Sequence, residues 1–273
     1  MRMRARKPGA EKVTSWAPME SFIESWKTFR EHANESETIA SCLRNWTLWK
    51  YQQDNRVADI GCGDGRMLEA IILKTAGPNV KILCTLLDPT RSFIEEAKQT
   101  ARRLSNVTAV TTLHGSLRKH FRRLPDSLDI AFFIHTACVV TPKEWDLVLS
   151  LAFRCTTVIW VMDNPTSVFT HCWSITAPTF YDRLQEAYEF LSKAAKDEAL
   201  KIEIAKRTVL ASNPFSFPKD VRDNILSLIC YADFRRLRDF EKKTIQRLIK
   251  NRLSHDRLPC DISLFKIGAN TRR

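Results

Sequence analysis

The chain has 273 residues, of which 44% are hydrophobic and 27% are charged. This composition is too apolar for a disordered protein, and the length suits one large globular domain. No apolar run approaches the roughly 18 residues that a transmembrane helix requires, so we expect no membrane partner. The basic N-terminus lacks the apolar stretch of a signal peptide, and we expect residues 1–18 to form a flexible tail.

Cysteine is frequent, with eight residues, but no Cys-x-x-Cys pair occurs. A zinc site usually shows paired spacing, and disulfide-rich secreted scaffolds are shorter than this chain. We therefore expect reduced thiols, no bound metal and a cytoplasmic protein.

The formal net charge of the chain is +12. A field of this sign attracts anions, including nucleic acid. However, the basic residues around 235–238 alternate with Phe234, Leu237 and Phe240, as on the solvated face of a helix. Nucleic acid is therefore the less favoured partner, and a small molecule is preferred.

Helical and strand-like segments alternate along the first part of the chain. Residues 19–50 have apolar side chains at helical spacing, and the short apolar run 56–60 then leads into a cluster of glycines. Beyond the glycines we expect helices at 67–74 and 92–104, and buried strands at 81–87, 107–113, 128–134 and 156–162. This alternation predicts a mostly parallel sheet with helices on both faces.

The last third of the chain departs from the alternation. We expect a helix at 180–196, a strand at 199–210, two helices within 219–253 and a final strand at 262–267. The fold class is therefore α/β, a doubly wound, Rossmann-like, seven-stranded sheet with an N-terminal helical cap and a closing antiparallel strand. No linker divides the chain, so residues 19–273 form one domain, with the cap at 19–52, a cofactor-binding core at 53–163, and lid and substrate-side elements at 164–273.

The glycine cluster is the most informative motif. Gly61, Gly63 and Gly65 follow the first strand at every second position, where glycine lets the backbone turn sharply and approach a ligand. A dinucleotide-binding fingerprint would need a third glycine at the position of Arg66. With Asp59 ahead of the glycines, the order instead resembles motif I of class I S-adenosylmethionine-dependent methyltransferases. A purely structural glycine turn is the remaining alternative.

That resemblance implies S-adenosyl-L-methionine as the cofactor and suggests a place for each part of it. Asp59 and the three glycines would surround the methionine part, and Asp88, at the end of the next strand, would accept the ribose hydroxyls. Ser116 would lie near the adenine, and Ile134 and His135 would flank the reacting centre. His135 is equally compatible with a buried structural histidine.

A second resemblance concerns the substrate. Residues 22–35, the run Leu87-Asp88-Pro89-Thr90 and residues 164–173 are similar to matching segments of the histamine N-methyltransferases. The likeness implies that Glu35 holds the ammonium group of a substrate. Aromatic side chains attract cations and exclude water, and the resemblance assigns this part to Phe22, Trp26, Phe169 and Trp173. Phe22 and Trp26 could equally belong to the apolar face of a core helix.

The chain departs from that family at Cys138 and Val139, where the family has tyrosines, and around Cys260 and Asp261, where it has an asparagine. We therefore expect N-methylation of an amine or nitrogen heteroaromatic other than histamine, with the proton going to solvent, Glu35 or His135. The alternatives are methylation of nucleic acid or a protein side chain, O-methylation of a small molecule, and binding without turnover. Residues 134–137 lack the Asn/Asp-Pro-Pro-aromatic motif common in nucleic-acid base methylases.

Overall fold

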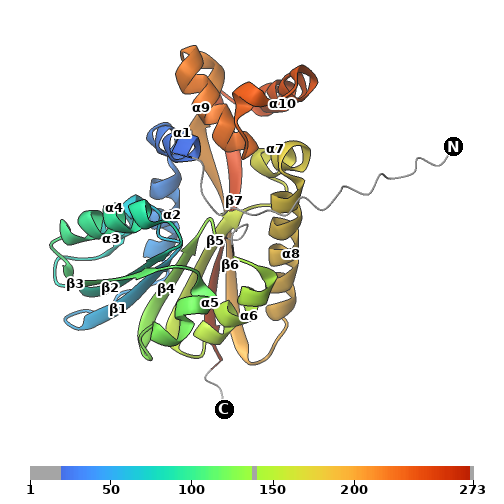
Figure 1. Cartoon of the computed structure of the whole chain (residues 1–273). Coiled ribbons are helices and arrows are strands. Elements are labelled where there is room, and N and C mark those ends of the chain that lie inside the picture. The colour runs from blue at the N-terminus through green and yellow to red at the C-terminus, as the bar shows by residue number, and fades with distance from the viewer. Residues whose placement is uncertain (1–19, 137–139, 271–273) are drawn as a thin grey trace.

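The computed structural model describes residues 20–136 and 140–270 (Figure 1). The predicted N-terminal tail and the departures at Cys138 and Val139 lie outside these residues. No helix in the described part of the chain is long and apolar enough to cross a membrane.

A seven-stranded sheet in the order β3-β2-β1-β4-β5-β7-β6 forms the centre of the molecule. The first five strands are parallel, and β7 is antiparallel to both of its neighbours. The strands are β1 Asp54–Ile60, β2 Lys81–Asp88, β3 Val107–His114, β4 Leu128–Ile134, β5 Cys155–Asp163, β6 Leu200–Ser212 and β7 Arg257–Ala269. The predicted sheet with its closing antiparallel strand is confirmed.

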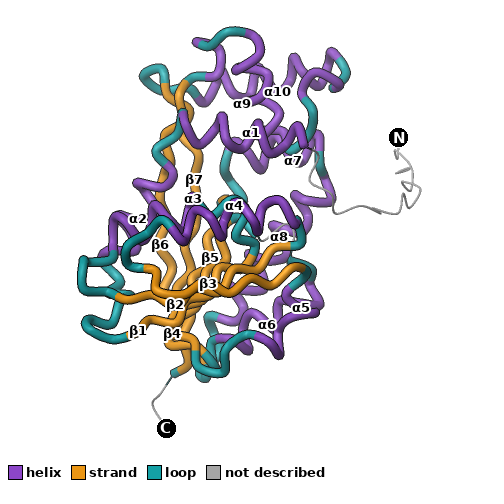
Figure 2. Tube along the Cα trace, turned by 60° about the vertical axis from the view of Figure 1, so that its left-hand side comes forward, coloured by secondary structure: helices purple, strands orange, loops and turns teal. Residues whose placement is uncertain are grey.

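Helices cover both faces of the sheet. Figures 1 and 2 place α2 (Glu35–Arg44), α3 (Arg66–Thr75) and α4 (Arg91–Arg102) on one side, and the following three helices on the other. These are the short α5 (Leu117–His120), which the 3-10 turn η1 (Phe121–Arg123) continues, α6 (Pro142–Leu151) and α8 (Pro178–Ala194). Because helices bury both faces, β4 and β5 are almost continuously apolar.

A separate group of helices lies beyond the carboxyl ends of the parallel strands. It contains α1 (Glu20–Glu31), α7 (Val168–Thr176), α9 (Lys219–Cys230) and α10 (Asp239–Arg252), and we call it the helical cluster (Figures 1 and 2). The turn η2 (Pro214–Ser216) connects β6 to α9, and the turn η3 (Phe234–Arg236) connects α9 to α10. Since β6 leads into α9 and β7 follows α10, the two long antiparallel strands carry half of this cluster.

The helical pattern of residues 19–50 is interrupted in the structure, where α1 and α2 are two helices separated at residues 32–34. Asn34 pairs with the edge strand β6 there. Its side-chain oxygen accepts a hydrogen bond from the backbone N–H of Leu210 (2.7 Å), and its own N–H donates to the Leu210 carbonyl (3.2 Å). The break therefore places Glu35 in the first turn of a new helix.

Asn55 provides a test of how the sheet is anchored. Its buried amide donates to the carbonyls of Lys50, Gln53 and Lys81 and accepts from the Lys50 N–H. Asn55→Ala leaves these buried groups unpaired, and we expect it to lower the free energy of unfolding by about 2–4 kcal/mol. Urea unfolding measures this, with exposed Gln53→Ala as the control, whose cost should stay within about 0.5 kcal/mol. An equal loss of unfolding free energy in the two variants would show that the hydrogen bonds of Asn55 do not anchor the sheet.

Candidate active site

The loop between β1 and α3 is built by three glycines with positive φ angles: 73° at Gly61, 53° at Gly63 and 78° at Gly65. A Cβ on Gly65 would lie 2.9 Å from the Cα of Ala97 in α4, so this position has room only for hydrogen. A Cβ on Gly61 would lie 2.4 Å from the Thr136 Cγ2, whereas one on Gly63 would meet nothing within 4 Å. Gly65 therefore serves packing, and Gly63 borders open space.

Asp88 fixes the same loop from the end of β2. One carboxylate oxygen accepts from the backbone N–H of Gly63 at 3.1 Å, and the other accepts from that of Thr90 at 2.8 Å. Burial raises the pKa of Asp88, and these hydrogen bonds offset part of the rise. A carboxylate so held is oriented and retains lone pairs for further donors.

Asp59, the last polar residue of β1, is buried beside this carboxylate. Burial, followed by the charges of Asp88 and Asp64, raises the pKa of Asp59 to about 7. Three carboxyl groups therefore meet around the glycine loop, and a ligand with a cationic part would favour their ionised forms.

Arg30 connects the helical cluster to this loop, and the sequence reasoning missed it. Its guanidinium donates to both carboxylate oxygens of Asp64, at 2.9 and 2.7 Å. It also lies over the ring of Trp26, at 5.5 Å from the centroid. The Arg30–Asp64 ion pair therefore holds α1 against the glycine loop. Asp64, the acid between the second and third glycines, was the sequence signal that could have predicted a basic partner such as Arg30.

Glu35, His135 and Asp163 form a buried charged cluster at the carboxyl ends of β4 and β5. The Nε2 of His135 lies 2.9 Å from Glu35 Oε1, and its Nδ1 lies 3.2 Å from Asp163 Oδ2. The Trp26 ring meets the imidazole edge-on at 5.8 Å. Asp163 was not predicted, although it is the polar residue that ends the apolar run of β5.

The charges in this cluster act on one another. Burial alone would lower the pKa of His135, but Glu35 and Asp163 raise it to about 10. Burial alone would raise the pKa of Glu35, but His135 and, more weakly, Arg30 bring it below its usual value. At neutral pH the imidazole is therefore a cation next to an ionised Glu35.

The predicted aromatic residues fall in two places. Trp26 lies beside His135, close to Glu35. Phe169 and Trp173 are buried on α7, where their rings contact Phe29 at 5.3 Å and Tyr231 at 5.7 Å. The side chain of Phe22 lies outside what the structure describes, so the four-residue aromatic box remains a prediction.

The remaining predicted residues lie at the same edge of the sheet. Ile134 ends β4, and Ser116 follows β3 and precedes α5, where its hydroxyl accepts from the Lys119 N–H at 3.4 Å. The predicted place of Ser116 near an adenine ring and that of Ile134 beside the reacting centre stay predictions.

Several buried polar atoms near these segments have no hydrogen-bond partner among the described residues. They are Arg30 Nε, Glu35 Oε2, Thr136 Oγ1, Ser167 Oγ, Trp173 Nε1 and His135 Nε2, which lies near Glu35 Oε1 without the angles of a hydrogen bond. A buried polar group without a partner typically lowers the free energy of unfolding by about 1–3 kcal/mol. Bound molecules that supply donors and acceptors would recover this cost, as expected of a ligand site.

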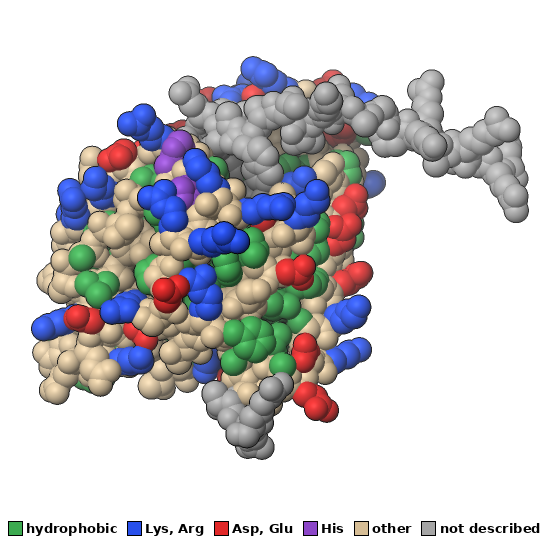
Figure 3. Space-filling view, turned by 60° about the horizontal axis from the view of Figure 1, so that its bottom comes forward, with side chains coloured by type: hydrophobic (Ala, Val, Ile, Leu, Met, Phe, Trp, Pro, Cys, Tyr) green, Lys and Arg blue, Asp and Glu red, His purple; other side chains and the backbone are tan. Residues whose placement is uncertain are grey.

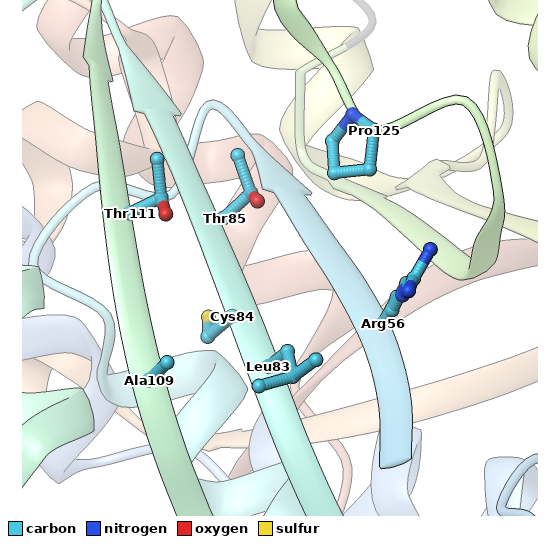
Figure 4. A pocket seen from close by; sticks show the side chains of 7 residues that line it. All are labelled: Arg56, Leu83, Cys84, Thr85, Ala109, Thr111 and Pro125. Carbon is cyan, nitrogen blue, oxygen red and sulfur yellow. The ribbon is translucent and has the colours of Figure 1, made fainter.

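A hollow lies away from this site, on the sheet face formed by β1, β2 and β3 (Figure 4). It encloses about 270 Å³, and its lining includes Arg56, Leu83, Thr85, Thr111 and Pro125. It shares no residue with the site at the carboxyl ends.

Residues 57–157 match a family model described as a methyltransferase domain. No curated protein matches the chain. A methyltransferase from Geobacter sulfurreducens, solved with S-adenosylhomocysteine, is 18% identical, with a TM-score of 0.50 over 92% of this chain and 98% of its own. One from Thiobacillus denitrificans, also with S-adenosylhomocysteine, is 18% identical, with a TM-score of 0.50 over 92% and 97%. These structures share the fold of this chain.

The glycine loop yields a prediction on stability and on ligand binding. Gly65→Ala should destabilise the protein by about 2–4 kcal/mol, because its Cβ would clash with the α4 backbone. Gly63→Ala should cost only about 1 kcal/mol, but its Cβ enters the open space and should weaken S-adenosylhomocysteine binding at least about tenfold, a loss of about 1.4 kcal/mol. Thermal unfolding and calorimetric titration separate the two effects. Unchanged affinity in Gly63→Ala would show that the ligand does not approach this loop.

Asp59 yields a further prediction, on pH. The pKa of Asp59 is about 7 in the folded state and 3.8 for an ordinary aspartate, so its contribution to stability is fully present below pH 3.8 and is lost as the pH rises from there through 7. Asp59→Asn should therefore match the wild type at pH 4 and exceed it at pH 8, by at most about 4 kcal/mol at 1.36 kcal/mol per pKa unit. Urea unfolding at both pH values measures the difference, and a variant that is less stable at pH 8 would refute it.

Proposed function

We propose that this chain, whose residues 57–157 match a methyltransferase domain, is an S-adenosylmethionine-dependent enzyme that methylates nitrogen in a small molecule bearing an amine or a nitrogen heteroaromatic ring. The observation that carries the proposal is Glu35. Its carboxylate is buried beside His135, and its Oε2 lacks a hydrogen-bond partner among the described residues.

The residues around the glycine loop suit the cofactor. The open space at Gly63 allows close approach to the backbone, and Asp88 is oriented with lone pairs available for the ribose hydroxyls. Asp59 and the glycines would hold the methionine part, Ser116 would lie near the adenine, and Ile134 and His135 would flank the reacting centre. When bound, S-adenosylmethionine supplies an activated methyl group on a sulfonium.

The protein then has to align the acceptor nitrogen and exclude water. Such alignment can contribute up to about 7–11 kcal/mol to the barrier reduction. Glu35, the Trp26 ring and the buried aromatic residues of α7 would provide the charge and the apolar walls. Because His135 is already protonated at neutral pH and the pKa of Glu35 is lowered, neither is suited to take a proton. We therefore assign loss of the acceptor's proton to solvent.

The net charge of +12 favours a second candidate, a methyltransferase acting on nucleic acid. On the face drawn in Figure 3, several Lys and Arg side chains gather above the middle, and acidic and hydrophobic ones lie below and beside them. Methylation of a protein side chain and O-methylation of a small molecule remain weaker alternatives, since a buried carboxylate suits a cation better than an alcohol. RNA binding that weakens steeply with salt would favour the second candidate.

The acceptor can be tested with radiolabelled cofactor and a panel of tryptamine, phenethylamine, histamine, nicotinamide and quinoline. Glu35→Gln should lower kcat/KM for the amines about 100-fold or more, because the ammonium loses its charged partner, which is worth about 2–3 kcal/mol. S-adenosylhomocysteine affinity should change less than about twofold, that is by about 0.4 kcal/mol.

The matched control is Glu37→Gln on the same turn of α2. Glu37 is exposed and pairs with Lys74 at the surface, where an ion pair contributes little. Activity should be unchanged in this variant. With chemistry limiting, the wild-type rate should rise with pH as the amine loses its proton. A flat profile, or full activity in Glu35→Gln, would contradict an amine acceptor.

A further inference from the structure

The cluster of Glu35, His135 and Asp163 contains two carboxylates and one imidazole. We propose that Asp163 is a positioning residue that holds His135 and gives the cluster its surplus negative charge, and that this surplus, rather than Glu35 alone, selects a cationic acceptor. The inference rests on the proposed function and names what sets its substrate class.

The geometry holds the imidazole between the two acids. His135 follows β4 with a φ of 53°, and its backbone N–H donates to the Val161 carbonyl at 2.8 Å. One ring nitrogen then lies 2.9 Å from Glu35 of α2, and the other lies 3.2 Å from Asp163 of β5. All three side chains are about nine-tenths buried or more. Three elements distant in the sequence thus meet at one ring.

The charge of the cluster follows from these contacts. A protonated His135 cancels the charge of Glu35, so these two residues alone would present a neutral pair to a ligand. Asp163 adds one further negative charge, and the formal total is −1. An ammonium group entering next to the unpartnered Glu35 Oε2 would bring the buried total to zero, which is the least costly state in a medium of low dielectric.

The surrounding described groups leave this charge uncompensated. Apart from His135, the cation that lowers the pKa of Glu35 is Arg30 of α1, and both terminal nitrogens of its guanidinium donate to Asp64. Cys260 of β7 faces both acids, and burial, with their charges, raises the pKa of its thiol well above the usual value, so it is neutral. The Trp26 ring carries no charge.

The test compares one variant that removes the surplus charge with one that restores it. Asp163→Asn leaves Glu35 and a protonated His135, with a total of zero. Adding His135→Asn removes the positive charge and returns the total to −1. Asparagine suits this position because it tolerates a positive φ better than most residues. A purely structural role for Asp163 predicts that the double variant is no better than the single one.

The probes are tryptamine, an alkyl ammonium that remains protonated to about pH 10, and its neutral analogue indole-3-ethanol. Both are titrated calorimetrically at pH 6 with S-adenosylhomocysteine bound. Asp163→Asn should weaken tryptamine binding at least about tenfold, or about 1.4 kcal/mol, and leave indole-3-ethanol unchanged. The double variant should recover most of the tryptamine affinity. Equal tryptamine affinity in Asp163→Asn and wild type would overturn the proposal.

The cation could also be the sulfonium of the cofactor. In that case Asp163→Asn would change the ratio of affinities for S-adenosylmethionine and S-adenosylhomocysteine and leave tryptamine unaffected, which would overturn the assignment to the acceptor. Our expectation is an unchanged ratio.

Ring nitrogen NMR of His135 separates this inference from the proposed function. If no amine binds the wild type while S-adenosylhomocysteine does, the proposed acceptor class fails and its selection by Asp163 fails with it. In that case the NMR spectrum still tests the charges assigned to Glu35, His135 and Asp163. A cationic imidazole at pH 7 that loses its proton at lower pH in Asp163→Asn supports the charge assignment, and a neutral imidazole in the wild type overturns it.

Discussion

Burial of a parallel sheet on both faces is the constraint on which the rest of this structure depends. Side chains along β4 and β5 must be apolar, because helices leave them no access to water. Polar groups are tolerated where the strands end, and Asp59, Asp88, His135 and Asp163 all lie at or near the carboxyl ends. The same constraint that builds the core thus collects the charged groups of the site along one edge.

The sequence predicted the sheet and the glycine loop well, because both depend on local patterns. Alternating apolar runs identified the parallel strands, and Asp59 with the three glycines identified the loop. The break at Asn34 could not be predicted in this way. It depends on hydrogen bonds to Leu210, 176 residues away, and the helical spacing on either side of it is undisturbed.

The site was predicted residue by residue but not as a set of interactions. Glu35 and His135 were each candidates, yet their contact depends on where α2 packs against the end of β4. Asp163 and Arg30 carry no motif of their own, and only the fold brings them to His135 and Asp64. The pairing changes the chemistry, since a histidine between two acids is a cation and no longer a candidate base.

The position of β7 has a consequence for how the chain is made. This strand is the last of the seven to be synthesised, yet it lies between β5 and β6 and pairs with both. Until it arrives, β6 is not connected to the sheet, and α9 and α10 lack one of the two strands that carry them. The first five strands can assemble during synthesis, whereas the helical cluster above them is completed only after β7 has been synthesised.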